Sequence, residues 1–256
     1  MKARFVENVA VSLFFLLSSS CLDAQPGSLD ISFNPGTGPN STVTCLALET
    51  NGQIVVGGNF TSFNGSSMSR IGRLNADGSI DATFSPGVGP NGQIFSTLAQ
   101  PDGKILVCGN YTYINGLPWN QPARFRTDGS LDLSFDTSAA DSGGAPADQV
   151  MELALQQDGK VLLAGGTITI SNIQFGGIAR LETNAVLDEE FNTGIGITNG
   201  LVAAIGLQST GKIIIGGSFT SFDGVSCNYI ARLNTDGSLD SSFSSGLQDG
   251  AVSTPQ

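Results

Sequence analysis

Arginine and aspartate recur along the chain at one fixed spacing, and these residue types could either bind a ligand or form ion pairs. Four arginines are each followed by an aspartate eight residues later. The pairs are Arg73 and Asp81, Arg124 and Asp132, Arg180 and Asp188, and Arg232 and Asp240. A ring of four cations could bind a ligand. Both partners are present in every copy, however, which favours a structural ion pair that fixes strand register.

The aspartates suggest two further kinds of chemistry. Paired carboxylates could serve a glycosidase, and the segment from Asn75 to Asp81 resembles an oxygen-rich calcium loop. The second copy of this segment begins with Arg126, and the third lacks the central aspartate and glycine. The same residues are those that a tight turn requires, so turn formation is favoured over metal binding. We therefore expect no metal and no cofactor.

The four pairs belong to a block that repeats without insertion. Each block begins at the glycine of a turn and ends at a phenylalanine, and all the blocks have the same length. They run from Gly52 to Phe84, Gly103 to Phe135, Gly159 to Phe191, and Gly211 to Phe243. Self-similarity at a fixed period indicates a repeat architecture.

Each repeat is predicted to contain four antiparallel strands. In the first copy, Val43–Leu48 is strand-like and precedes an Asn-Gly turn. The apolar strand Ile54–Val56 should be buried on both faces, and Gly58 at its end should mark a bulge or a close backbone approach. A longer loop precedes the strand that carries the arginine. A second Asx-Gly turn then leads to a short fourth strand, Leu/Ile-Asp-x-x-Phe.

This pattern predicts an all-β, β-propeller-like array of four-stranded antiparallel blades. We expect four blades in an open arc or incomplete ring, because Leu29–Phe33 is a surplus copy of the fourth strand. A β-solenoid is the competing architecture. The expected divisions are a signal peptide at 1–24 and a repeat domain at 27–256, with repeats at 34–84, 85–135, 136–191 and 192–243 and a tail at 244–256.

The N-terminus has the features of a secretory signal. Lys2 and Arg4 precede the apolar run Val9–Leu17, and cleavage after Ala24 would follow. The alternative is a lipoprotein signal with acylated Cys21. We expect a secreted, periplasmic or cell-surface protein with no transmembrane segment after signal removal. The remaining cysteines are Cys45, Cys108 and Cys227, which show no CxxC spacing and are read as small hydrophobic residues.

The recurring motifs also match a known family. Gly-Ser-Leu-Asp-x-x-Phe, Gln-x-Asp-Gly-Lys-Ile, Gly-Gly-x-Phe-Thr and Ala-Arg-Leu-Asn-x-Asp-Gly follow one another in that order. This series resembles the delta-60 repeat of bacterial secreted proteins and covers residue 27 to about residue 250. The resemblance implies a propeller-like fold and no general enzymatic activity.

Length variation is confined to the connection between one repeat and the next. In an up-and-down blade this connection lies on the same face as the loop between strands two and three, and such a face often binds ligands. Its candidate ligand-binding residues are Tyr111, Tyr113 and Trp119, with Asp141 and Asp148. Trp119 could instead pack its loop onto the blade. Asp136 and Glu152 extend the acidic group, and acidic loops are usually solvated.

Composition excludes several functions. The net charge of −11 argues against nucleic acid and anionic membranes as partners. The absence of histidine removes Ser-His-Asp triads and histidine-based metal sites. The sequence thus favours a non-enzymatic scaffold for an unknown protein or glycan. A carbohydrate- or peptide-binding propeller is the alternative, and a propeller hydrolase is disfavoured.

Overall fold

The computed structural model describes residues 29–119, 121–135, 150–170 and 173–243. The chain divides into two units, Met1–Ser32 and Phe33–Gln256. In the described end of the first unit, the Ser32 amide donates a hydrogen bond to Asp30 Oδ1 at 2.9 Å and closes a turn. The strand expected over Leu29–Phe33 is therefore not formed. Across the described residues, no helix has the length and apolar character that a bilayer span requires.

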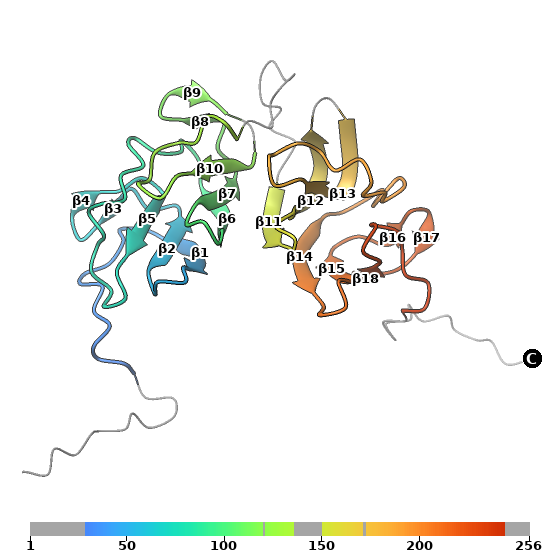
Figure 1. The fold of residues 1–256 in the computed structure, drawn as a ribbon, viewed down its shortest axis with the longest axis horizontal. Coiled ribbons are helices and arrows are strands. Elements are labelled where there is room, and N and C mark those ends of the chain that lie inside the picture. Colours follow the sequence, from blue (N-terminus) through green and yellow to red (C-terminus); the bar gives the residue numbers. More distant parts are fainter. Residues whose placement is uncertain (1–28, 120, 136–149, 171–172, 244–256) are drawn as a thin grey trace, which may run out of the picture. The chain divides into compact units, whose positions relative to one another are not determined.

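The described part of the second unit contains four three-stranded antiparallel sheets, which we call blades 1 to 4 in chain order (Figure 1). The first strands are β1 (Val43–Leu48), β6 (Ile94–Ala99), β11 (Val150–Leu155) and β14 (Val202–Leu207). The second strands are β2 (Ile54–Gly58), β7 (Ile105–Gly109), β12 (Val161–Ile170) and β15 (Ile213–Gly217). The third strands are β5 (Ile71–Leu74), β10 (Ala123–Phe125), β13 (Ile173–Leu181) and β18 (Ile230–Leu233).

The fourth strand of each blade is shortened to a single bridged residue. In blade 1, Leu74 of β5 bridges Ile80. Equivalent bridges join Phe125 to Leu131, Leu181 to Leu187, and Leu233 to Leu239. The strand ends at once because the next residue, Asp81, accepts a hydrogen bond from the Thr83 amide at 2.9 Å, and this turn bends the backbone.

The predicted loop between strands two and three is a second, small hairpin in three of the described blades. These hairpins pair β3 (Ser62–Phe63) with β4 (Ser66–Ser67), β8 (Tyr113–Ile114) with β9 (Leu117–Pro118), and β16 (Ser221–Phe222) with β17 (Val225–Ser226). Asn64 and Gly65 at the tip of the first hairpin both have positive φ, as a two-residue type I′ turn requires. In blade 3 the same hairpin is continuous with β12 and β13.

The glycine at the end of the second strand has the role predicted for it. Opposite Gly58, the register of β1 shifts between Val43 and Cys45, which places a bulge there. A side chain on Gly58 would collide with the Thr42 carbonyl oxygen. The same register shift occurs opposite Gly109, Gly165 and Gly217.

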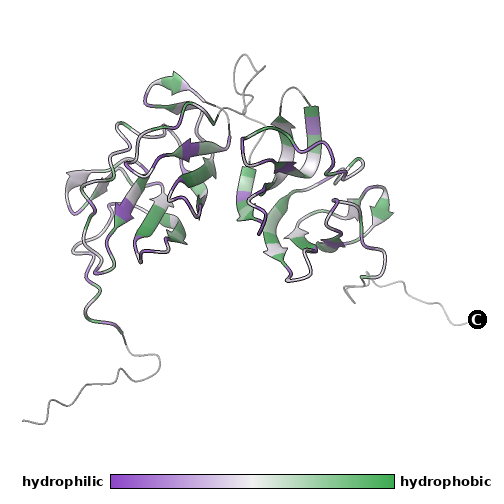
Figure 2. Cartoon of the chain, in the orientation of Figure 1, coloured by the Kyte–Doolittle hydropathy of each residue, from purple (hydrophilic) through white to green (hydrophobic). Residues whose placement is uncertain are grey.

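The hydrophobic core lies mainly between consecutive blades, whose first strands are neighbours: β1 lies beside β6, β6 beside β11, and β11 beside β14. The second strands of blades 1 to 3 are largely buried, as predicted, and Val55, Leu106 and Leu162 are each 0% exposed, whereas Ile214 on β15 is partly exposed. Figure 2 shows hydrophobic residues concentrated on the strands, whereas the turns are largely hydrophilic. The phenylalanine that ends each repeat fills the next junction: Phe84 packs between blades 1 and 2, and Phe135 between blades 2 and 3.

Candidate functional site

Each described blade contains the same arginine–aspartate pair that the sequence spacing predicts. The arginine lies on the third strand and the aspartate follows the bridged residue, so the antiparallel register brings the two side chains together. Nε of the arginine donates to Oδ2 of the aspartate. The distances are 2.7 Å for Arg73–Asp81, 2.9 Å for Arg124–Asp132, 2.6 Å for Arg180–Asp188 and 2.7 Å for Arg232–Asp240.

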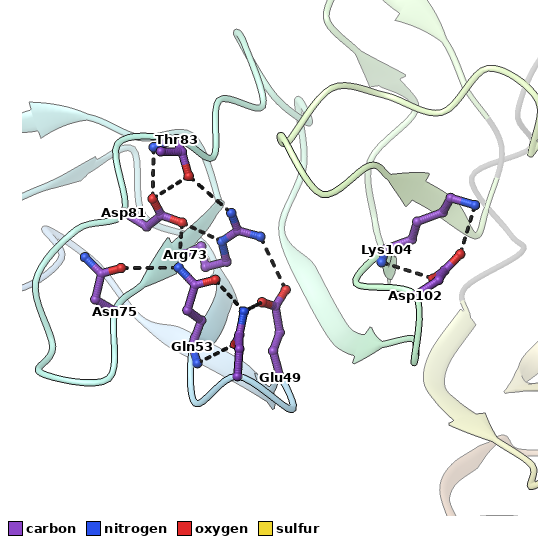
Figure 3. A network of polar contacts seen from close by, with 9 residues as sticks. Glu49, Gln53, Arg73, Asn75, Asp81, Thr83, Asp102 and Lys104 are labelled. Carbon is purple, nitrogen blue, oxygen red and sulfur yellow. Dashed lines mark hydrogen bonds and ion pairs between the residues drawn. The ribbon is translucent and has the colours of Figure 1, made fainter.

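The other carboxylate oxygen is also occupied. Figure 3 shows Asp81, whose Oδ1 accepts hydrogen bonds from the amide and hydroxyl of Thr83 at 2.9 and 2.7 Å. Burial alone would raise the pKa of Asp81, but the hydrogen bonds from Thr83 and the contact with Arg73 outweigh it and hold the pKa at about 2. Asp81 is therefore a fully ionised structural anion at neutral pH.

Each guanidinium also lies over an aromatic ring. Arg73 Cζ lies 4.9 Å from the centroid of Phe84, the last residue of the same repeat. The corresponding distances are 4.4 Å for Arg124 and Phe135, 4.4 Å for Arg180 and Phe191, and 4.9 Å for Arg232 and Phe243. Each arginine thus links a strand, a turn and the phenylalanine at the blade junction.

The second partner of the aspartate differs between repeats. Lys160 Nζ contacts Asp188 at 2.8 Å and Lys212 Nζ contacts Asp240 at 2.6 Å, whereas neutral Gln53 takes this place beside Asp81 at 2.8 Å. In blade 2, Lys104 turns away and pairs with Asp102 at 2.9 Å (Figure 3). Asp132 is contacted by Arg126 at 3.3 Å instead.

The aromatic residues predicted to bind a ligand differ in their exposure to solvent. Tyr111 is 2% exposed: its hydroxyl donates to the Val107 carbonyl and accepts from the Ala123 amide, each at 2.9 Å. Its inclusion as a ligand-binding residue was wrong, because both of these partners lie in the core of blade 2. Trp119 is half-buried against the core between blades 1 and 2, the packing role considered for it. Tyr113 is 46% exposed at the β8–β9 hairpin.

Of the predicted acidic residues, only Glu152 lies within the described part of the chain. Asp141 and Asp148 lie outside the described residues, as do Asp136, the signal segment 1–24 and Cys21. Glu152 is described on β11, where it is half-buried, and burial raises the pKa of its carboxyl. Cys45, Cys108 and Cys227 are free thiols. Within the described ranges, no three cysteine, aspartate or glutamate side chains form a group that could hold a metal ion.

A cavity of about 670 Å³ lies between the turns that connect the first two strands of blades 3 and 4. The turn of blade 3 contributes Gln156, Gln157 and Asp158, and the turn of blade 4 contributes Gln208 and Ser209. This cavity is on the side of the tight Asx-Gly turns, whereas the sequence had pointed to the side of the longer loops. Sequence reasoning missed it because its two walls are about fifty residues apart in the chain.

Arg180 lines this cavity, where three hydrogen bonds fix its side chain in addition to the contact with Phe191. Its Nε donates to Asp188 at 2.6 Å, and its Nη1 donates to the Thr235 carbonyl at 2.7 Å and to Gln156 Oε1 at 3.4 Å. The contact with Thr235 crosses from blade 3 to blade 4. Leu207, which is 42% exposed, supplies an apolar surface beside the polar side chains. The cavity therefore offers amide and hydroxyl groups that can both donate and accept hydrogen bonds.

The repeated blades and their arginine–aspartate–phenylalanine contacts define a β-propeller repeat protein. A family model described as "Domain of unknown function (DUF5122) beta-propeller" matches residues 49–84, 100–135, 156–191 and 208–243, which is more than half of the chain. The chain belongs to this family. Among curated proteins, no significant relative was found.

Solved structures resemble the chain at low sequence identity. The extracellular domain of BT4673 from B. thetaiotaomicron has 13% identity and a TM-score of 0.46, and the match covers 77% of this chain and 22% of that one. A gluconolactonase, XC5397 from Xanthomonas campestris, has 14% identity and a TM-score of 0.44, with 76% and 59% covered. The chain spans less than a quarter of the first of these structures. Likenesses this distant carry no information on activity.

Proposed function

We propose that the chain is a non-enzymatic propeller scaffold, secreted or exposed at the cell surface, that binds a carbohydrate in the cavity between blades 3 and 4. The observation that carries this proposal is the cavity itself, whose lining includes Gln157 and Ser209, at a turn position that has a different residue in every repeat. Gln157, Asp158, Gln208 and Ser209 surround Arg180, whose charge is already neutralised by Asp188.

The chemistry of the rim favours a neutral, hydroxyl-rich ligand. Amides and hydroxyls donate and accept hydrogen bonds at once, which matches the hydroxyl groups of a sugar. The Leu207 side chain offers an apolar surface for the C–H face of a sugar ring. An anionic ligand is less favoured because Asp158 lies on the rim.

Binding can be tested by titrating the purified chain with neutral mono- and oligosaccharides in a calorimeter, after a glycan-array screen. The double variant Gln157→Ala, Gln208→Ala should weaken binding at least tenfold, or about 1.4 kcal/mol. Gln174→Ala, an exposed amide on β13, is the matched control and should leave the affinity unchanged. Equal binding by both variants, or no sugar bound at all, would refute the proposed site. Turnover of the bound sugar would refute a non-enzymatic role.

A second candidate function is protein binding by the small hairpins. Tyr113 and Leu117 are 46% and 48% exposed on the β8–β9 hairpin, and Val225 is 53% exposed on β17. Exposed aromatic and aliphatic side chains of this kind contribute to protein interfaces. In a pull-down with this chain as bait, a protein that binds the wild-type chain and the Gln174→Ala variant but not the double variant Tyr113→Ala, Leu117→Ala would favour this function over sugar binding.

We also propose that the chain is exported and that it is a member of the delta-60 group. The order of the repeat motifs supports membership in the delta-60 group, and the N-terminal sequence supports export. Mass spectrometry of the protein from its native host tests the second point. A mature chain that begins at Gln25 indicates signal cleavage, and a lipid-modified Cys21 indicates the anchored alternative. A retained Met1 would exclude both.

A further inference from the structure

The described junctions between consecutive blades share one design. We call the side of a blade that packs on the following blade its forward face and the other side its back face. At the junction of blades 1 and 2, the forward face contributes Val55 and Ile71, and the back face contributes Ile105 and Val107. All four side chains are 0% exposed. The other two described junctions place Leu106 against Leu163, and Leu162 against Ile215.

Within the described residues, no strand covers the forward face of blade 4. Ile214 and Ile230 are partly exposed there, whereas their counterparts Val55 and Ile71 are fully buried. The Arg232 side chain on this face is 22% exposed, against 8 to 10% for the arginines of the other three blades. The first strand presents the small residues Ala204 and Gly206, both exposed.

On the back face of blade 1, the described structure leaves the first strand uncovered. Leu46 and Leu48 on β1 are 63% and 73% exposed. Leu153, the counterpart of Leu46 in blade 3, is 4% exposed because blade 2 covers it. Phe33 packs against the same side of blade 1, where it occupies the place that Phe84 has on blade 2. Phe33 thus supplies one element of a preceding repeat, while none of the described sheets packs on the leucines of β1.

We propose that the back face of blade 1 binds the forward face of blade 4 of a second copy of this chain. The two open faces are the two halves of the junction that the structure repeats internally. Their shapes also correspond to the junction of blades 3 and 4, where small Ala154 packs in the same cluster as larger Ile205. In the proposed contact, Gly206 stands in the place of Ala154, and Leu46 stands in the place of Ile205.

A head-to-tail contact of this kind must close into a ring or grow without limit. Propellers have about four to eight blades. Two copies of the four described blades would give eight, which is within that range, and three copies would exceed it. A single copy closed on itself would bury both faces, yet Leu48 is exposed and Ile214 is partly exposed. The inferred assembly is therefore a closed dimer with two identical junctions.

The test is the molar mass of the purified chain in solution, measured by light scattering from micromolar to nanomolar concentration. The wild-type chain should have twice the monomer mass. Leu48→Glu and, separately, Ile214→Glu should each raise the dissociation constant about 100-fold or more, because each replaces an apolar side chain of the junction with a carboxylate that must lose its hydration. Val88→Glu is the matched control: Val88 is 76% exposed, as Leu48 is 73% exposed, but lies outside both faces.

Mixing the two variants distinguishes a head-to-tail contact from other dimers. A mixture of Leu48→Glu chains and Ile214→Glu chains can form one intact junction, so part of the dimer should return. A dimer that pairs back face with back face would be lost with Leu48→Glu and would survive Ile214→Glu. Mixing would then leave the Leu48→Glu chains monomeric, which would overturn the proposal. A monomeric wild-type chain, or a dimer that neither substitution weakens, would overturn it too. Circular dichroism melting confirms that each variant is folded.

Discussion

Arg124 lies between two partners of opposite character: its Cζ is 4.4 Å from the centroid of Phe135, and its Nη2 is 2.8 Å from Asp132 Oδ2. The same arrangement recurs in the other described blades. The arginines of blades 1 to 3, which could have belonged to a ligand-binding ring, are therefore fixed parts of the described blade junctions.

Arg73→Leu should destabilise the protein more than Arg180→Leu. Without Arg73, buried Asp81 retains no contacting cation, because its remaining partners are neutral Gln53 and Thr83. Breaking such a buried pair costs about 3–5 kcal/mol. Without Arg180, Asp188 still has Lys160 at 2.8 Å, and we expect a cost of about 2 kcal/mol. Urea denaturation measures both, and equal costs would contradict this account of the second cation.

Stability should fall as the pH decreases from about 4 to about 2. Burial opposes ionisation of Asp81, but the hydrogen bonds from Thr83 and Arg73 prevail and lower its pKa from 3.8 to about 2. The unfolded chain therefore binds this proton first, so the contribution is complete above pH 4 and is lost as the pH reaches 2. Linkage gives about 2 kcal/mol for this group. The pKa values of Asp132, Asp188 and Asp240 are also lowered.

Melting temperatures between pH 2 and pH 7 test this prediction. Asp81→Asn should lower stability at pH 7 and flatten the acid-side slope relative to wild type. Ser66→Ala, at an exposed residue of β4, should leave the slope almost unchanged, because the Ser66 side chain makes no hydrogen bond to an aspartate in the described structure. A slope that Asp81→Asn leaves intact would show that the acid sensitivity arises elsewhere.

Gly109→Ala should be strongly destabilising, whereas Gly166→Ala should be nearly neutral. The methyl group at position 109 would collide with the backbone carbonyl oxygen of Gln93, where the bulge of β6 brings the two strands close. Overpacking against backbone costs about 1–3 kcal/mol. The same methyl group on Gly166 would meet nothing within 4 Å. Chemical denaturation of the two variants gives the comparison, and a tolerated Gly109→Ala would show that the strand ends can separate.

Tyr111→Phe should cost about 1–3 kcal/mol, because it leaves the Ala123 amide and the Val107 carbonyl without their hydrogen-bond partner in the core. Tyr113→Phe, at a residue that is 46% exposed, should leave the free energy of unfolding almost unchanged, as surface substitutions usually do. Both values come from the same denaturation experiment. The opposite order would return Tyr111 to the list of candidate surface residues.

Local features that depend on neighbouring residues were predictable from the sequence. The apolar second strands, the Asx-Gly turns, the bulge at Gly58 and the Arg73–Asp81 pair all follow from residue type and register within one repeat. The small hairpin at Asn64-Gly65 was also encoded in this way, but the short strands beside it resembled an irregular loop.

Features that depend on the meeting of distant segments were not predictable. Tyr111 and Tyr113 are two residues apart and look equivalent in the sequence, yet only the packing of blade 2 decides that the first is buried. The cavity beside Arg180 exists because the turns of blades 3 and 4 come together. No periodicity within a single repeat contains that information.

Phe84 and Phe33 show that the unit of sequence and the unit of packing are out of phase. In repeats 1 to 3 the final phenylalanine fills the junction ahead of its own blade, so a duplication of one sequence repeat would also copy half of the next contact. New blades could therefore be added or lost without the invention of a new interface. Recombination within such a gene would preserve the fold wherever the cut falls at the same point of the period, and propeller size could change in single steps.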